Sequence, residues 1–195
     1  MSNVSGVIKS IQDIMRKDVG VDGDAQRISQ LVWMFFLKIL DDREEELELI
    51  DLEFQSPLPE HLRWRNWAAD RQGDTGEKLL DFVNLQLFPR LKGDFPVQGE
   101  VARRAQVIRD VFEDAYNYMK SGTLLRQVIN KINEIDFNNS EDRHTFGAIY
   151  EQVLKDLQSA GNAGELHPAR GYQIHHRPAR SQAERGGIRD RKSVV

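Results

Sequence analysis

The chain contains no cysteine, which excludes disulfide bonds, thiolate nucleophiles and cysteine-based metal sites. It also lacks a glycine-rich phosphate loop, the H-E-x-x-H pair and the G-x-S-x-G turn of common catalytic sites. His175 and His176 are adjacent, but no other ligand stands at a spacing suited to a metal ion. No paired acid–base constellation supports an unrecognised enzyme, so the residues alone predict a helical interaction module.

Long hydrophobic runs are missing as well. The most apolar stretch, Leu31–Leu40, is interrupted by Lys38 and is far shorter than the roughly 20 residues that span a bilayer. The N-terminus has no basic start followed by an apolar run and a cleavage site, as a signal peptide would. We therefore expect a soluble, cytoplasmic protein without membrane contact.

Positive charge is scarce except at the C-terminus. Residues 1–166 hold 20 Lys and Arg against 29 Asp and Glu, whereas residues 167–195 hold 7 against 2. Such a split indicates a boundary between unlike segments. We expect a helical domain over residues 1–160, and a linker with a basic tail over residues 161–195.

The apolar residues that are present follow helical spacing. Ala25–Leu40 is apolar nearly all round and predicts a buried central helix. Its expected core face consists of Ile28, Leu31, Val32, Phe35, Phe36, Ile39 and Leu40, with Trp33, Met34 and Leu37 on the opposite side. Further helices are predicted over Val4–Asp18, Glu77–Leu91, Glu100–Lys120, Thr123–Ile135 and Asp142–Ser159. No strand alternation is visible, so the fold class is all-α: a compact bundle of about seven or eight helices with an irregular C-terminal tail.

Two further stretches allow two interpretations each. The acidic run Asp41–Glu53 suits a metal or partner site, but is more typical of a solvated helix face with Leu47, Ile50 and Phe54 on its buried side. Trp64 and Trp67, together with Arg63 and Arg65, suit a surface that stacks nucleic-acid bases. Packing of the two indoles onto the core is the favoured interpretation.

Two segments together resemble a known family. They are Gln30–Glu46 (QLVWMFFLKILDDREEE) and Thr145–Leu154 (TFGAIYEQVL), the second followed by Ala160–Glu165 (AGNAGE). In this order and separation they are similar to the N-terminal region of the M (modification) subunit of type I restriction-modification systems. The resemblance covers about residues 4–165.

The resemblance implies a helical domain in front of an adenine-N6 DNA methyltransferase domain. That second domain binds S-adenosylmethionine through a glycine-bearing loop and carries an Asn-Pro-Pro-Phe motif, neither of which exists here. The implied role is a clamp domain without its enzyme, with no catalytic residue, metal or cofactor of its own. Implied partners are another M subunit, the specificity and restriction subunits, and duplex DNA. The alternative is a helical protein–protein module without a DNA role.

If DNA is contacted, cations away from the acidic run are the candidates, because phosphates attract positive side chains. On this criterion we select Arg103, Arg104, Arg126 and Lys131.

The tail departs from the family pattern. The family continues from Gly-Glu into Phe-Tyr-Thr-Pro-Arg, whereas this chain has Gly164-Glu165-Leu166-His167-Pro168. Loss of one nucleotide turns codons for Glu-Phe-Tyr-Thr into codons for Glu-Leu-His, and the shifted frame beyond can encode Thr-Pro-Arg. We therefore hypothesise that residues 167–195 are out-of-frame translation; the alternative is a genuine basic arm that grips phosphates.

Resequencing the gene from the codon for Ala160 to well past that for Val195 tests this hypothesis. We expect the shifted frame to stay open as far as a glycine-bearing cofactor loop and Asn-Pro-Pro-Phe. If no such frame exists, the basic tail is genuine and the hypothesis is wrong.

Overall fold

The computed structural model describes residues 4–93, 95–139, 144, 147 and 151. Within these residues every regular element is helical and no strand occurs, which confirms the all-α class. If α4, η2 and α5 are counted as one helix and the three-residue 3₁₀ turn η1 is left out, this part of the chain has six helices, fewer than the seven or eight predicted. The predicted last helix lies almost entirely outside the described residues, as do the tail and the histidine pair.

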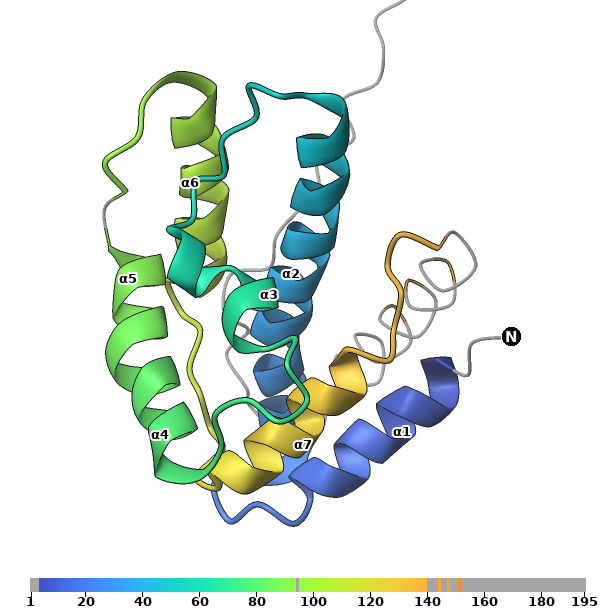
Figure 1. Ribbon diagram of the computed structural model, residues 1–195. Helices are drawn as coiled ribbons and strands as arrows, with labels where there is room; N and C mark the ends of the chain where they lie inside the picture. Colours follow the sequence, from blue (N-terminus) through green and yellow to red (C-terminus); the bar gives the residue numbers. More distant parts are fainter. Residues whose placement is uncertain (1–3, 94, 140–143, 145–146, 148–150, 152–195) are drawn as a thin grey trace, which may run out of the picture.

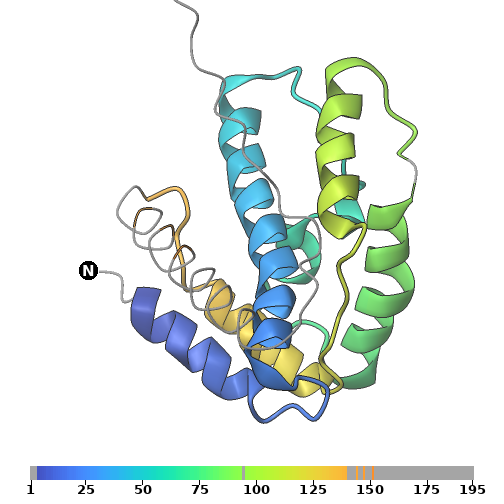
Figure 2. The ribbon, with the colours of Figure 1, turned by 180° about the vertical axis from the view of Figure 1, so that it is seen from behind.

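One long helix, α2, runs the length of the bundle, and the others pack around it (Figures 1 and 2). The continuous α4–η2–α5 helix and α6 follow each other along the length of the bundle and meet at α5, while α1 and α7 pack together across one end. No helix in the described part is long and apolar enough to cross a membrane. The elements are α1 (Val4–Met15), α2 (Gly23–Ile50), η1 (Glu60–Leu62), α3 (Trp64–Trp67), α4 (Gly76–Asp81), η2 (Phe82–Leu87), α5 (Phe88–Lys92), α6 (Gly99–Phe112) and α7 (Gly122–Ile132).

The central helix is buried as predicted, but its most buried face is not the expected one. Trp33, Met34 and Leu37 are 0–1% exposed, whereas Ile39 on the expected core face is 37% exposed. Leu31 and Phe35 of the expected face are buried, and the others are only partly so. Apolar spacing could not separate the two sides because both are apolar; packing against α5, α6 and α7 decides between them.

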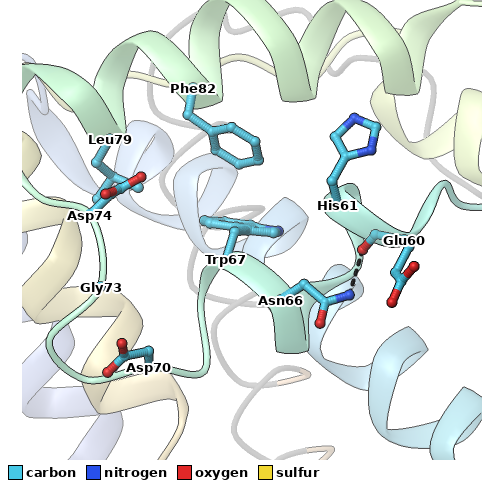
Figure 3. A pocket seen from close by; sticks show the side chains of 9 residues that line it. All are labelled: Glu60, His61, Asn66, Trp67, Asp70, Gly73, Asp74, Leu79 and Phe82. Atoms are coloured by element: carbon cyan, nitrogen blue, oxygen red, sulfur yellow. Dashed lines mark hydrogen bonds between the residues drawn. The ribbon is translucent and has the colours of Figure 1, made fainter.

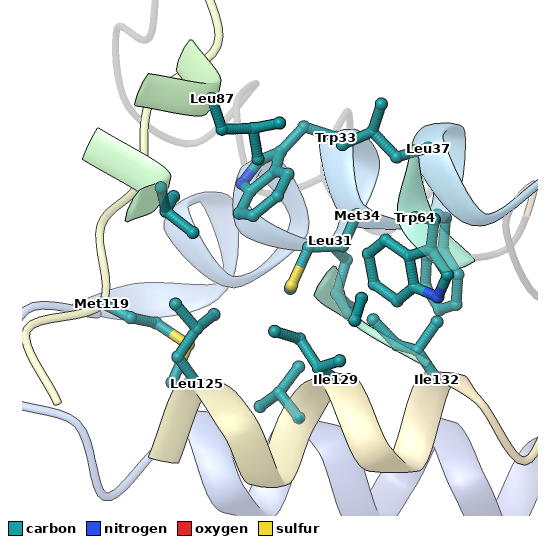
Figure 4. Packing of buried hydrophobic residues seen from close by; sticks show 14 of the residues in the cluster. Leu31, Trp33, Met34, Leu37, Trp64, Leu87, Met119, Leu125, Ile129 and Ile132 are labelled. Carbon is teal, nitrogen blue, oxygen red and sulfur yellow. The ribbon is translucent and has the colours of Figure 1, made fainter. Parts of the chain in front are cut away.

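That face of α2 joins two halves of the core. On one side the Trp33 ring meets Phe88 of α5 edge-on, with centroids 5.1 Å apart, and Phe88 lies 5.4 Å from Phe112 of α6. On the other side Met34 faces the apolar residues of α7, with Trp64 beside Ile132 (Figure 4). Edge-to-face ring pairs add stability beyond their buried area, so the aromatic half fixes the distance between α2, α5 and α6.

Helix α6 ends well before the predicted residue, Lys120, and the chain continues without regular structure to α7. Side chains from the N-terminal part of the chain accept hydrogen bonds from the backbone N–H groups of this irregular segment. The N–H of Tyr118 donates to Gln30 Oε1 at 2.8 Å, and those of Lys120 and Ser121 donate to the Asp18 carboxylate at 2.9 Å. Because a buried N–H requires an acceptor, these long-range bonds replace the helical ones that the apolar pattern predicted.

Two glycines, Gly122 and Gly20, allow backbone segments that are distant in sequence to come into contact. A Cβ atom on Gly122 would lie 1.8 Å from the carbonyl oxygen of Gly76, where the starts of α4 and α7 meet. A Cβ atom on Gly20 would lie 2.1 Å from the carbonyl oxygen of Tyr118. Any side chain at either position must push the backbones apart.

We expect Gly122→Ala to lower the free energy of unfolding by about 3 kcal/mol, because the added methyl group overlaps a backbone atom that cannot rotate away. Urea denaturation measures the loss. Gly147→Ala is the control, since a Cβ atom there meets nothing within 4 Å. Equal stability of the two variants would show that the α4–α7 contact is not tight.

Candidate functional site

The acidic run at the end of α2 is not simply a solvated face. Asp41, Asp42 and Glu44 are only 5%, 6% and 2% exposed. Conversely Ile50, which was expected on the buried side, is 78% exposed. Asp41 and Glu44 are turned inward toward Arg65 and Ser56 of the segment that packs against α2, and Asp42 pairs with Lys38 of α2 itself.

Arg65 of α3 is the main partner of these carboxylates. Its Nε donates to Asp41 Oδ1 at 2.8 Å, its Nη1 donates to Glu48 Oε2 at 2.7 Å, and its backbone N–H donates to Asp41 Oδ2 at 3.0 Å. Arg63 Nη1 donates to Glu48 Oε1 at 2.9 Å. Both arginines are therefore directed at α2.

Trp64 and Trp67 pack against the hydrophobic core, as the favoured interpretation predicted. Trp64 is 1% exposed, and its Nε1 donates to Asn133 Oδ1 at 2.8 Å. Trp67 is partly buried, and its ring lies 5.2 Å from that of Trp64. With Arg63 and Arg65 bound to carboxylates, the alternative of a basic stacking surface loses its cations.

Two carboxyl groups of the run remain incompletely paired. Burial raises the pKa of Glu44, although a hydrogen bond from Ser56 opposes the shift. Burial also raises the pKa of Asp42, opposed by the bond from Lys38. Glu44 Oε1 and Asp42 Oδ2 have no hydrogen-bond partner. Even so, no group of three or more potential ligands in the described part of the chain could hold a metal ion.

A surface pocket of about 660 Å³ lies between α3, α4 and the loop that joins them. The Trp67 indole is at its centre with the Phe82 ring beside it, centroids 5.3 Å apart (Figure 3). Asp70 and Asp74 lie on one side of the indole, and Glu60 on the other. The sequence indicated Trp67 but not these carboxylates, because they belong to a turn and a short helix without a recognisable motif.

The turn that carries these carboxylates is held by Arg126 of α7. Arg126 is 5% exposed, and its guanidinium donates to the backbone carbonyl oxygens of Trp67, Ala68, Asp70 and Asp74 at 2.7–3.2 Å. Burial lowers its pKa, opposed by the charges of Asp74 and Asp70. The contacts that the structure gives this DNA-contact candidate are thus structural.

The other three DNA-contact candidates do not meet in one place. Arg103 is exposed at the start of α6 and pairs with Glu100 at 3.0 Å. Arg104 lies over the Phe54 ring, 4.6 Å from its centroid. Lys131 is on α7, at the far end of the bundle from the start of α6, and pairs with Glu134 at 2.9 Å (Figure 1).

We expect Arg65→Ala to lower the free energy of unfolding by about 2–3 kcal/mol, because it leaves the buried Asp41 carboxylate without its ion pair. This is below the cost for a fully buried pair, since the Arg65 side chain is 23% exposed. Thermal and urea unfolding measure the loss. Arg103→Ala is the control, and as an exposed pair it should change stability by less than about 0.5 kcal/mol. Equal effects of the two variants would contradict the role given to Arg65.

Known proteins match this chain over its helical domain. A family model described as the HsdM N-terminal domain matches residues 4–132. The type I restriction enzyme EcoEI methylase subunit of Escherichia coli is 60% identical over 168 residues, which are 86% of this chain and 34% of that protein. This chain therefore spans about a third of the length of that curated relative.

Solved structures agree with the sequence matches. The crystal structure of a modification subunit from Vibrio vulnificus YJ016 has a TM-score of 0.69 and 39% identity, covering 84% of this chain and 37% of that chain. A structure that describes complex assembly and conformational transition of the type I R-M system has a TM-score of 0.67 and 31% identity, covering 79% and 30%. The chain belongs to the family of HsdM N-terminal domains, the helical amino-terminal part of type I modification subunits.

Proposed function

We propose that this chain is the clamp and assembly domain of a type I adenine-N6 DNA methyltransferase. In this role it joins another M subunit, a specificity subunit and the restriction subunits around duplex DNA in the cytoplasm. The observation that carries the proposal is the family match over residues 4–132, together with the 60% identity to a type I methylase subunit. The similarity to a structure concerned with type I complex assembly supports the partners.

We further propose that methyl transfer belongs to a domain beyond this one. The full-length relatives would use S-adenosylmethionine, whereas this sequence has neither the glycine-bearing cofactor loop nor Asn-Pro-Pro-Phe. The alignment with the E. coli subunit covers 168 of the 195 residues, a length close to that of the helical domain before the basic tail. We propose the division of the chain into residues 1–160 as the helical domain and 161–195 as linker and out-of-frame remnant.

The surface of the domain suits protein assembly better than direct DNA recognition. Residues 1–166 are acidic, and acids repel phosphates. Arg103 is the best-placed DNA-contact candidate, because its side chain, at the start of α6, is 83% exposed. Arg104 and Lys131 are weaker candidates, since each is partly buried.

Binding to a type I specificity subunit tests the assembly role against the alternative of an unrelated helical module. The purified chain is mixed with the specificity subunit of the system, and the mixture is analysed by size-exclusion chromatography with mass detection. We expect a complex that full-length M subunit displaces in competition. If the chain neither binds the specificity subunit nor competes with the M subunit, the unrelated module is the better description.

DNA contact through Arg103 predicts a specific change in that complex. We expect Arg103→Ala to weaken binding to duplex DNA and to reduce the slope of log K against log salt by about 1, the value for one lost phosphate contact. Fluorescence anisotropy at several salt concentrations measures both. Arg16→Ala is a closely matched control, because Arg16 is exposed and pairs with Asp13 three residues earlier, as Arg103 pairs with Glu100. Equal slopes for the two variants would remove Arg103 from the DNA contact.

A further inference from the structure

We infer that the pocket around Trp67 is a docking site for an arginine side chain carried by a partner polypeptide. The pocket combines an aromatic centre with carboxylates on both sides (Figure 3). Its volume of about 660 Å³ lies within the range of small-ligand sites, so an arginine with its flanking backbone can enter. This inference goes beyond the proposed assembly role. It rests on that role only in that the arginine belongs to a protein partner of the complex.

The indole of Trp67, the aromatic centre of the pocket, is held in a fixed orientation that suits a planar cation such as guanidinium. Trp67 cannot turn freely, because its Nε1 donates to the carbonyl oxygen of Leu62 at 3.2 Å and its ring contacts those of Trp64 and Phe82. The indole is only partly buried, and its exposed part lines the pocket. A guanidinium group stacks on an indole face and is attracted by its quadrupole, and tryptophan is the strongest aromatic partner for such contacts. A fixed indole loses little entropy when it binds.

The charge around this centre favours a cation. The Glu60 carboxylate has no partner among the described residues. Asp70 Oδ1 accepts one bond, from the backbone N–H of Gln72 at 2.9 Å, and retains further acceptor sites. Only Asp74 is paired with a side chain, that of Lys78 at 2.7 Å, and Lys78 is 77% exposed.

The arginines nearest to the pocket leave these carboxylates available. Arg63 and Arg65 are turned toward Glu48 and Asp41 of α2. Arg126, beneath the turn, uses its N–H groups on backbone carbonyl oxygens and none on a carboxylate. An incoming guanidinium can therefore lie against the exposed part of the Trp67 indole and donate to a carboxylate of the pocket, a pair of contacts that arginine makes better than lysine.

The test is a titration of the full ¹⁵N-labelled chain with the capped peptide acetyl-Gly-Arg-Gly-amide, observed at the indole N–H signals. Trp33 is buried and does not line the pocket, so its signal serves as the internal reference. We expect a saturable shift of the Trp67 signal in the millimolar range. The matching citrulline peptide, which has the same shape without the charge, should bind at least about tenfold more weakly.

Two variants separate the pocket from a general effect of acidic charge. Glu60→Gln should weaken binding of the arginine peptide about fivefold, while Glu77→Gln, exposed on α4 and outside the pocket lining, should leave it unchanged. The absence of a saturable shift, equal binding of the citrulline peptide, or equal effects of the two variants would each overturn the inference. None of these results bears on binding to the specificity subunit, so the assembly role is tested separately.

Discussion

The fold depends on one helix face that changes chemistry along its length. In the middle of α2 this face is apolar, with Trp33, Met34 and Leu37 fully buried. Toward its ends it is polar, with Gln30 at one end and Asp41 and Glu44 at the other, all at most 5% exposed. These polar side chains bind the two irregular segments that cross the bundle, and so one helix holds both the core and the connections around it.

The polar ends of α2 are necessary because irregular backbone cannot satisfy its own hydrogen bonds. The segment before α7 donates to Gln30 of α2 and to Asp18 in the turn before α2, and the Arg65 backbone N–H at the start of α3 donates to Asp41. Each such bond adds only about 1 kcal/mol, whereas a buried N–H left without a partner costs about 1–3 kcal/mol. The arrangement therefore specifies where the segments lie more than it adds net stability, and Glu44 and Asp42 even retain an unpaired oxygen each.

Long-range hydrogen bonds from buried or partly buried side chains also position the pocket around Trp67. Arg65 fixes one side of α3 to α2, and Arg126 fixes the following turn to α7. The pocket is thus built between two anchored elements, which suits a surface that must hold its shape before a partner arrives. Arg126, which the sequence offered as a surface cation, is thus used inside the domain.

The sequence by itself determined the class, the family and the positions of most helices, because apolar spacing is local and the resemblance depends on order along the chain. It also favoured packing of Trp64 and Trp67, since large apolar rings are usually buried. Tertiary structure alone decided which face of α2 is most buried, where α6 ends and what Arg126 binds. Each of these depends on partners distant in sequence, such as Gln30 and Tyr118, which are 88 residues apart. A periodic pattern shows that a side chain can be buried, but only the assembled fold supplies the acceptor or the opposite charge that determines where a polar group lies.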